Sequence, residues 1–364
     1  MIYDAIVIGG GIAGITSAYF LQKEGMSVLL LEKGEICKKG SFAAGAFLSP
    51  KIGKQSLYKD YVNKALEFSL NFYEKEFPSL LNRCGLLKLP YDEEDKKRLG
   101  AYEEFMKEIQ WERRGEGYFF KNAAIIDPLD LCKAMTKNIK IIKIEAKNIE
   151  KREELFEVEG FKTKYLILSV GSEKIPLNIP YLKTKIICGY RYDARFQGDF
   201  NLKHNFHKRV SVSAFFKNRV AIGATHIKYR ECFELLKTAK EDKYSLLERA
   251  KEIMPLKNLK ILKIYTGERL STFDFFPIVG EVIDEKRTLC KYPYLKKGTK
   301  VPPSSFIYRK NLYLHTALGA RGFVLAPYNA HLLAKAITKK KELPPFLSPY
   351  RQFIKYARKL PVNG

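Results

Sequence analysis

The N-terminal segment consists of two short apolar runs separated by a glycine-rich turn. Residues 4–8 show no clear alternation of apolar and polar positions, which is typical of a strand buried in a parallel sheet. Residues 12–23 predict a helix that opens at the glycines, and residues 26–31 predict a second strand. Together these elements predict a complete βαβ unit.

The glycine spacing adds candidate chemistry to this unit. Gly9, Gly11 and Gly14 fit the G-x-G-x-x-G pattern between strand and helix, and Glu32 follows the second strand. Gly9 allows the tight turn, Gly11 lets the backbone approach a pyrophosphate, and Gly14 lets helix and strand pack closely. The start of the helix supplies N–H groups and a partial positive charge for phosphates. Glu32 can accept hydrogen bonds from a ribose, so the unit predicts a dinucleotide site.

The rest of the chain predicts two interleaved domains, each made of separate pieces. A helix is expected over 61–77, because its apolar residues fall on one face. Further elements are a strand within 139–146, a hairpin and core strand over 155–172, a strand over 210–216, a helix over 244–255, and strand, turn and helix over 311–338. This order of strands and helices predicts an α/β (α+β) fold.

The charge balance is unusual. Lys and Arg number 65 against 40 Asp and Glu, a formal net charge of +25. Such a protein attracts polyanions such as nucleic acid or an anionic membrane. A lysine-rich genome or a thermophilic source would explain many lysines, but not their excess over acids. No apolar run reaches the roughly 18 residues that a membrane span needs, and no signal peptide is recognisable, so we expect a cytoplasmic protein with no membrane partner.

The cysteines give no indication of a metal site. Six cysteines are scattered along the chain, and none forms a CxxC pair. This spacing predicts neither a zinc site nor a disulfide framework.

Three further segments, taken with the βαβ unit, carry a family resemblance. They are "SFAAGAFLSP" (41–50), "LILSVGS" (166–172) and "LGARGFVLAP" (318–327). With them the chain resembles the D-amino-acid-oxidase-like superfamily of FAD enzymes, which includes sarcosine and glycine oxidases. The resemblance implies a Rossmann-like FAD-binding domain with an interleaved mixed-sheet substrate domain. The implied FAD-binding domain comprises 1–77, 126–178, 266–283 and 307–364. The implied substrate domain comprises 78–125 and 179–265, and residues 284–306 are expected to form an exposed basic loop.

The same resemblance implies where FAD is held. The pyrophosphate would lie over the first glycines, the adenine near 145–149, and the flavin ring between the 44–46 and 319–324 segments. The implied cofactor-binding residues are Gly9, Gly11, Ile12, Ala13, Gly14, Glu32, Lys33, Ser41, Ala44, Gly45, Ala46, Lys147, Val170, Gly171, Gly319, Ala320, Arg321, Gly322, Phe323 and Val324. A helix beginning near Val324 would point its positive end at the flavin and stabilise negative charge there.

A closer resemblance lies in the C-terminal third. "GERLSTFDFFPIVGEV" (267–282) and "ELPPFLSPYRQFIKYARKL" (342–360) resemble the oxidase half of bifunctional tRNA 5-methylaminomethyl-2-thiouridine biosynthesis enzymes. The resemblance implies oxidative removal of the carboxymethyl group from 5-carboxymethylaminomethyl-uridine at the wobble position of a tRNA. Because the chain begins directly at its FAD-binding strand, we expect a stand-alone oxidase whose product passes to a separate methyltransferase.

Arg269 and Arg321 are the catalytic candidates. They match two arginines of the family pattern, and a guanidinium binds a carboxylate through two parallel hydrogen bonds. Such a clamp would fix the neighbouring CH₂ for hydride transfer. No nucleophile or general base is evident. His226, His315 and His331 could assist or could be structural.

Four basic segments are candidates for tRNA contact, and each could equally be a solvated surface. They are Lys339–Lys341, the face formed by Arg351, Lys355 and Arg358, and the mixed cationic and aromatic stretches 112–121 and 203–209. Three functions remain open: a tRNA-modifying FAD oxidase, a small-molecule amine oxidase or dehydrogenase for glycine, sarcosine or a D-amino acid, and a flavin-binding RNA protein without turnover.

Overall fold

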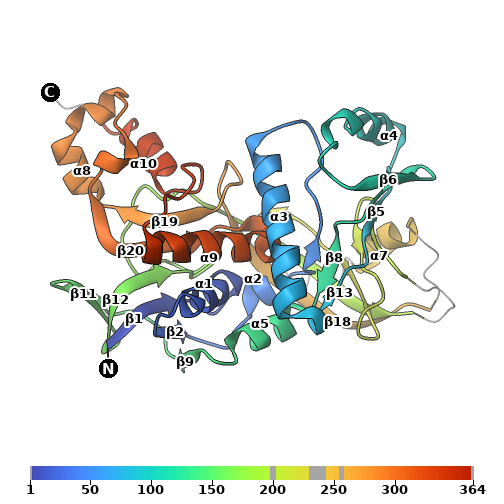
Figure 1. Cartoon of the computed structure of the whole chain (residues 1–364). Helices are drawn as coiled ribbons and strands as arrows, with labels where there is room; N and C mark the ends of the chain where they lie inside the picture. Colours follow the sequence, from blue (N-terminus) through green and yellow to red (C-terminus); the bar gives the residue numbers. More distant parts are fainter. Residues whose placement is uncertain (1, 197–201, 229–242, 254–257, 362–364) are drawn as a thin grey trace.

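The computed structural model describes residues 2–196, 202–228, 243–253 and 258–361. Two large sheets form the frame of the molecule, an eight-stranded first sheet and a nine-stranded second sheet. Figure 1 shows the first sheet beside helices α1 and α9, and the second sheet at the other side of helix α3. The predicted mixed α/β fold is therefore confirmed.

The first sheet is built around the predicted βαβ unit. Parallel strands β2, β1 and β12 lie side by side, and β9 and β20 extend the parallel part. Ile8 pairs with both Leu31 and Leu168, so the carboxyl ends of these strands meet at one edge. Its strands are β1 (Ile2–Ile8), β2 (Val28–Glu32), β9 (Lys140–Lys143), β10 (Ile149–Arg152), β11 (Leu155–Val158), β12 (Phe161–Leu168), β19 (Ile278–Ile283) and β20 (Tyr308–Thr316).

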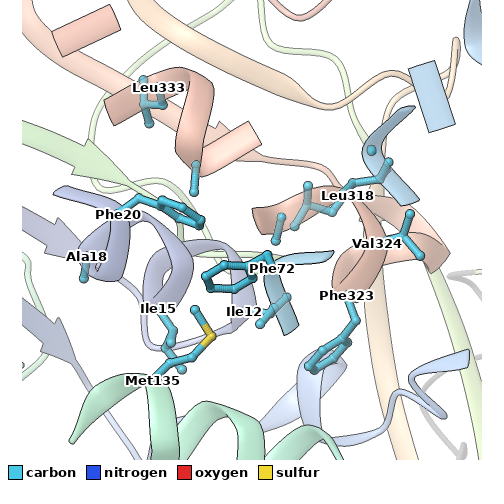
Figure 2. Packing of buried hydrophobic residues seen from close by; sticks show 14 of the residues in the cluster. Ile12, Ile15, Ala18, Phe20, Phe72, Met135, Leu318, Phe323, Val324 and Leu333 are labelled. Carbon is cyan, nitrogen blue, oxygen red and sulfur yellow. The ribbon is translucent and has the colours of Figure 1, made fainter. Parts of the chain in front are cut away.

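Helices cover the first sheet and bury its largest apolar cluster. These are α1 (Ile12–Lys23), α3 (Leu57–Glu76), α5 (Pro128–Thr136) and α9 (Gly322–Lys339). In Figure 2, Phe20 of α1 lies close to Phe72 of α3, and their ring centroids are 5.0 Å apart. Met135 of α5 and Val324 of α9 belong to the same cluster. Burying one large apolar side chain contributes about 1.5–3 kcal/mol, so the cluster holds α1, α3 and α9 firmly against one another.

The second sheet is dominated by one long antiparallel pair, β13 (Lys185–Arg195) and β18 (Lys260–Ser271). Its other strands are β5 (Leu86–Lys88), β6 (Trp111–Arg114), β7 (Gly117–Phe120), β14 (Asn205–His207), β15 (Ser211–Val212), β16 (Val220–Gly223) and β17 (Ile227–Lys228). A small sheet contains β3 (Phe47–Leu48), β4 (Leu81–Asn82) and β8 (Ala124–Ile126). Within the described residues, the other α-helices are α2 (Lys39–Phe42), α4 (Glu93–Gly100), α7 (Lys243–Lys251), α8 (Glu285–Lys291) and α10 (Tyr350–Ala357).

Several local predictions differ from the structure. The segment 284–306 is not an exposed loop, since it contains α8 and its Leu295, Val301 and Phe306 are buried in a core cluster. The strand expected over 210–216 is limited to β15. Residues 266–271, assigned to the FAD-binding part, pair with β13 in the second sheet. Cys188 is disulfide-bonded, which its spacing did not predict.

The predicted domain bounds otherwise stay a prediction. Residues 197–201, 229–242 and 254–257 of the expected substrate domain, and with them the end of the helix expected over 244–255, lie outside the described residues. Within the described ranges, no helix is long and apolar enough to cross a membrane. The same ranges contain no group of His, Cys, Asp and Glu side chains that could hold a metal ion.

Candidate active site

A cavity of about 710 Å³ is lined by residues from both large sheets. The carboxyl edge of the first sheet contributes Ile8, Leu31 and Ser169, and the second sheet contributes residues of β5, β13, β14, β15 and β18. Ligands of parallel α/β sheets bind at such a carboxyl edge. The cavity therefore joins the predicted dinucleotide site to the second sheet.

Close packing makes two glycines of the motif irreplaceable. A Cβ built on Gly14 would lie 1.8 Å from the carbonyl oxygen of Gly9, so α1 can approach β1 only with glycine there. Gly9 has φ +108°, and a Cβ on it would lie 2.4 Å from the carbonyl oxygen of Ser169. Gly11 differs, because its Cβ would meet only the Ser41 Oγ, at 3.2 Å. Gly9 and Gly14 thus shape the turn, while Gly11 keeps space open above it.

The start of α1 is prepared for an anion. Gly11 is the N-cap residue, no acidic residue lies in the first turn, and no side chain of the cap closes it. The Ile12 N–H donates to the Ser41 Oγ at 2.9 Å, and the helix dipole adds positive charge to this end. Glu32 accepts hydrogen bonds from the N–H groups of Gly10 (2.6 Å) and Gly34 (2.8 Å), which fixes its carboxylate at the edge of the cavity.

Most of the predicted cofactor-binding residues line this cavity. They are Gly9, Gly11, Ile12, Ala13, Glu32, Lys33, Ser41, Ala44, Gly45, Ala46, Val170, Gly171, Gly319, Ala320, Arg321, Gly322, Phe323 and Val324. Gly14 lies behind the turn, where it permits packing. Lys147 is not among the lining residues, and its Nζ lies 2.9 Å from the Glu145 carboxylate. Because β9 ends earlier than expected, Ile144, Glu145 and Ala146 line the cavity there instead.

A second helix also begins at the cavity. The short helical turn Gly319–Arg321 leads directly into α9, whose first turn has no acidic residue and no side-chain cap. A Cβ on Gly322 would lie 3.2 Å from the Ile12 side chain, so the starts of α9 and α1 are neighbours. Both helices thus direct the N–H groups of their first turns and their positive dipole ends toward one cavity.

Arg269 lies on β18 and lines the cavity. Its Nη1 donates to the Thr225 carbonyl oxygen at 3.1 Å, and it forms no ion pair with any described residue. Burial lowers the pKa of its guanidinium, which means that its charge is poorly solvated. A cation held in this way is a receptor for an anionic group.

Arg321 also lines this cavity, and like Arg269 it forms no ion pair with any described residue. Its Nη1 donates to the Ser49 carbonyl oxygen at 2.7 Å, and burial lowers its pKa. Lys51 also lines the cavity, and burial followed by the charge of Arg321 lowers the pKa of its ammonium. An isolated β-bridge joins Ser271, two positions after Arg269, to Leu318, three before Arg321. The sheet therefore brings both arginines to one region.

Arg191 was missed by the sequence reasoning, and His207 was named only as part of the 203–209 stretch expected to contact tRNA. Arg191 of β13 is buried, pairs with Asp193, donates to the Ala43 carbonyl oxygen at 3.1 Å, and lies over the Tyr265 ring at 3.8 Å. His207 of β14 contacts the Ser211 Oγ at 2.8 Å, and burial together with the charge of Lys88 lowers its pKa to about 4. No motif surrounds Arg191, and the mixture of cations and aromatics around His207 did not indicate that this side chain lies in the cavity.

The three histidines named from the sequence lie in different surroundings. His226 lines the cavity, and burial and the charge of Arg269 lower its pKa. His315 is fully buried, and its Nδ1 lies 2.8 Å from the Ser17 Oγ of α1. His331 packs on the rings of Phe20 and Phe68. Neither His315 nor His331 lines the cavity, so of the three only His226 can meet a ligand there.

Several cations of the predicted tRNA clusters are paired within the protein. Lys339 lies 2.7 Å from Glu24, and Arg114 lies 2.6 Å from Glu112. Arg351 lies 3.1 Å from Asp274, its side chain is only 12% exposed, and it also donates to the Phe276 carbonyl oxygen at 2.5 Å. Arg351 is therefore a structural contact of α10, contrary to the expectation that it faces tRNA.

Comparison with known families decides the class of protein. A family model described as FAD dependent oxidoreductase (DAO) matches residues 4–336. The chain belongs to this family. It is an FAD-dependent oxidoreductase that acts on C–N bonds of amines or amino acids. The glycine cradle, the two helix starts and the residues that line the cavity fit a bound dinucleotide.

The curated relatives fall into two groups. The tRNA 5-methylaminomethyl-2-thiouridine biosynthesis bifunctional protein MnmC of Campylobacter hominis is 26% identical over 447 residues, which cover 98% of this chain and 64% of that protein. The protein of the same name from Campylobacter concisus is 26% identical, covering 92% and 56%. Glycine oxidase of Bacillus subtilis is 22% identical, covering 83% and 90%. The chain thus spans between half and two thirds of the length of the two bifunctional proteins.

Solved structures share the fold. Glycine oxidase from Geobacillus kaustophilus matches with a TM-score of 0.73 at 18% identity, covering 95% of this chain and 98% of that one. L-amino acid deaminase from Proteus myxofaciens matches with a TM-score of 0.74 at 17% identity, covering 96% and 93%. At these identities the likeness concerns the arrangement of the chain.

Proposed function

We propose that this protein oxidatively removes the carboxymethyl group of 5-carboxymethylaminomethyl-(2-thio)uridine at the wobble position of tRNA, leaving 5-aminomethyl-(2-thio)uridine. The observation that carries the proposal is the pair of cavity-lining guanidinium groups, Arg269 and Arg321, without a carboxylate partner in the described structure. The +25 net charge and the similarity to the bifunctional tRNA-modifying proteins support a tRNA substrate.

The arginines bind the carboxylate of the substituent. A guanidinium forms two parallel hydrogen bonds with a carboxylate, and a partly desolvated guanidinium binds it more strongly than one in water. Fixing the carboxylate orients the adjacent CH₂, which is the carbon to be oxidised. Thr225 and Ser49 hold Arg269 and Arg321 through backbone carbonyls, so each arginine keeps its direction before the substrate arrives.

The cofactor site follows from the same residues. Gly9, Gly11 and the start of α1 would hold the pyrophosphate, and Glu32 the ribose. The start of α9 would stabilise negative charge on the ring system. When bound, FAD would supply the acceptor for the hydride, and with it the two electrons, that leaves the CH₂.

The products are set by the substrate chemistry. Loss of a hydride from the CH₂ and of a proton from the nitrogen leaves an imine, and water hydrolyses the imine to glyoxylate and the aminomethyl base. A neutral amine is needed for this step, and the cationic surroundings of Arg269, Arg321 and Lys51 favour it. We further propose that the aminomethyl product passes to a methyltransferase.

A small-molecule amine oxidase acting on glycine, sarcosine or a D-amino acid is the second candidate. The observation that favours it is the similarity to glycine oxidases over nearly their full length. The two arginines would serve the carboxylate of a free amino acid equally well. The candidates differ in what must enter the cavity: a nucleotide of a folded RNA, or a molecule of a few atoms.

Anaerobic flavin reduction separates the two candidates. The holoenzyme is mixed with tRNA carrying the carboxymethylaminomethyl group, with the same tRNA carrying the aminomethyl group, and with glycine or sarcosine. We expect rapid loss of oxidised-flavin absorbance with the first tRNA and none with the second. Rapid reduction by glycine or sarcosine, and none by the first tRNA, would establish the small-molecule oxidase instead.

A further inference from the structure

The loop at 272–277, between β18 and β19, presents two phenylalanine rings to solvent. Phe273 is 66% exposed and Phe275 is 54% exposed, whereas the residues around them, Thr272 and Phe276, turn inward. Large aromatic side chains seldom remain this exposed without a partner, because burying each would release a substantial area from water. The alternation shows that the two rings share one outward side of the loop.

The loop is held in this arrangement by polar contacts beneath it. Arg351 contacts the Asp274 carboxylate at 3.1 Å, and Thr272 donates to the Phe276 carbonyl oxygen at 2.8 Å. Phe275 has φ +67°, a left-handed conformation that costs a bulky residue on the order of 1–3 kcal/mol. The surroundings therefore impose the outward position of Phe275 against its backbone preference.

The loop that carries the two rings begins next to cavity-lining residues of β18. Arg269 is on the same strand, two positions before Ser271, where β18 ends and the loop begins. On the other side, the Phe275 ring lies 6.1 Å from the ring of Tyr58. Burial raises the pKa of Tyr58, and the positive charge of Arg321 partly opposes this rise. Tyr58 therefore lies near Arg321.

A cation completes the surface. The Nζ of Lys185 lies 5.4 Å from the centroid of the Phe273 ring and 4.9 Å from that of the Phe275 ring. Lys185 is the first residue of β13 and pairs with Ser271. Exposed aromatic faces beside a positive charge are the features by which proteins bind single-stranded nucleic acid, through base stacking and phosphate attraction.

We propose that Phe273, Phe275 and Lys185 form a stacking platform for unpaired nucleotides of the RNA loop that carries the substrate uridine. The identity of that loop as an anticodon loop rests on the proposed function, whereas the recognition of unpaired nucleotides rests on the platform itself. A paired helix conceals its base faces, so the platform selects a loop over a stem. The flanking nucleotides would stack on the phenylalanines while the modified uridine enters the cavity.

Binding measurements test the platform separately from oxidation. A fluorescently labelled, unmodified anticodon stem-loop RNA and a fully paired RNA of equal length are titrated against wild type, Phe273→Ala, Phe275→Ala and the double variant. We expect Kd for the stem-loop to rise about tenfold for each ring removed, and Kd for the paired RNA to stay unchanged. Retained FAD and an unchanged melting temperature confirm the fold of each variant.

Phe215→Ala is the matched control. Phe215 is 45% exposed, and its ring lies 6.4 Å from that of Phe196, which directly follows β13. Lys185 begins β13, so the length of this strand separates the two positions by about 30 Å. This variant is expected to bind the stem-loop as wild type does.

The outcomes distinguish the platform from the proposed function. Three results would overturn the platform, even if modified tRNA is oxidised. The double variant binds the stem-loop as wild type does, or wild type does not bind the stem-loop, or the variants lose equal affinity for the stem-loop and for the paired RNA. Loss of stem-loop binding in a protein whose wild type oxidises only free amino acids would uphold the platform and overturn the function. With both upheld, the free modified nucleoside should reduce the flavin of the double variant as fast as that of wild type.

Discussion

The guanidinium of Arg269 lies directly against Gly189 of the neighbouring strand. A Cβ built on Gly189 would lie 2.7 Å from Nη1 and 2.8 Å from Nη2 of Arg269, and 2.3 Å from the Thr225 carbonyl oxygen that accepts the hydrogen bond of Nη1. The absence of a side chain at Gly189 therefore sets both the position of the arginine and that of its backbone acceptor. This contact makes the orientation of Arg269 testable without removing the arginine.

Gly189→Ala should reduce its flavin at least about 100-fold more slowly with the carboxylated substrate, because the added methyl group displaces both the guanidinium and the Thr225 carbonyl oxygen that holds it. Flavin content and circular dichroism separate this effect from a loss of fold through the contact with the Thr225 backbone. Arg269→Lys should behave alike, since lysine keeps the charge but loses the two-pronged geometry. Stopped-flow absorbance gives the rates, and Gly100→Ala on α4, where a Cβ has ample space, is the control. An unchanged rate for Arg269→Lys would remove this residue from the site and leave Arg321 as the candidate.

Substitutions of Gly11 and Gly14 should separate cofactor binding from folding. Gly11→Val should fold but purify without flavin, because its side chain meets only Ser41 and projects where the pyrophosphate would lie. Gly14→Val should fail to fold, because its Cβ would collide with the Gly9 carbonyl oxygen. Flavin absorbance per protein and circular dichroism measure the two properties. Normal flavin content in Gly11→Val would show that the turn does not hold the cofactor.

His315 should make the protein sensitive to mild acid. Burial lowers its pKa to about 3, whereas an unfolded histidine titrates near about 6.5. Because the folded value is the lower one, the stability it contributes is fully present above about pH 6.5 and is lost as the pH falls toward about 3. Between about pH 7 and pH 5 the free energy of unfolding should fall by about 2 kcal/mol from this group. Urea unfolding of wild type and His315→Asn measures it, and equal pH slopes would contradict the assignment.

The sequence predicted the parts of the site that depend on backbone conformation. The βαβ unit could be predicted because its apolar runs, the fixed spacing of its glycines and Glu32 all indicate the same structure. The structure places Gly9 and Glu32 at the cavity. Arg269 and Arg321 could be found because short motifs surround them. The prediction of an exposed loop over 284–306 was wrong. Its many lysines and prolines suggested solvent exposure, whereas the apolar residues between them pack into the core.

Residues that meet only through tertiary structure could not be predicted. Arg191 and His207 reach the cavity from different strands of the second sheet, and nothing in their local sequence distinguishes them from surface residues. Arg351 was misassigned because helical spacing placed it on a cationic face, while its partner Asp274 is distant in sequence. Local patterns give the faces of elements, but not what packs against them.

Mass spectrometry of nucleosides tests the central claim most directly. The holoenzyme is incubated with undermodified tRNA, and the digested nucleosides are quantified together with released glyoxylate. The account predicts that 5-carboxymethylaminomethyl-(2-thio)uridine declines while 5-aminomethyl-(2-thio)uridine and glyoxylate appear in equal amounts, and that Arg269→Lys slows all of these changes. Unchanged nucleosides with a holoenzyme that oxidises glycine or sarcosine would contradict it.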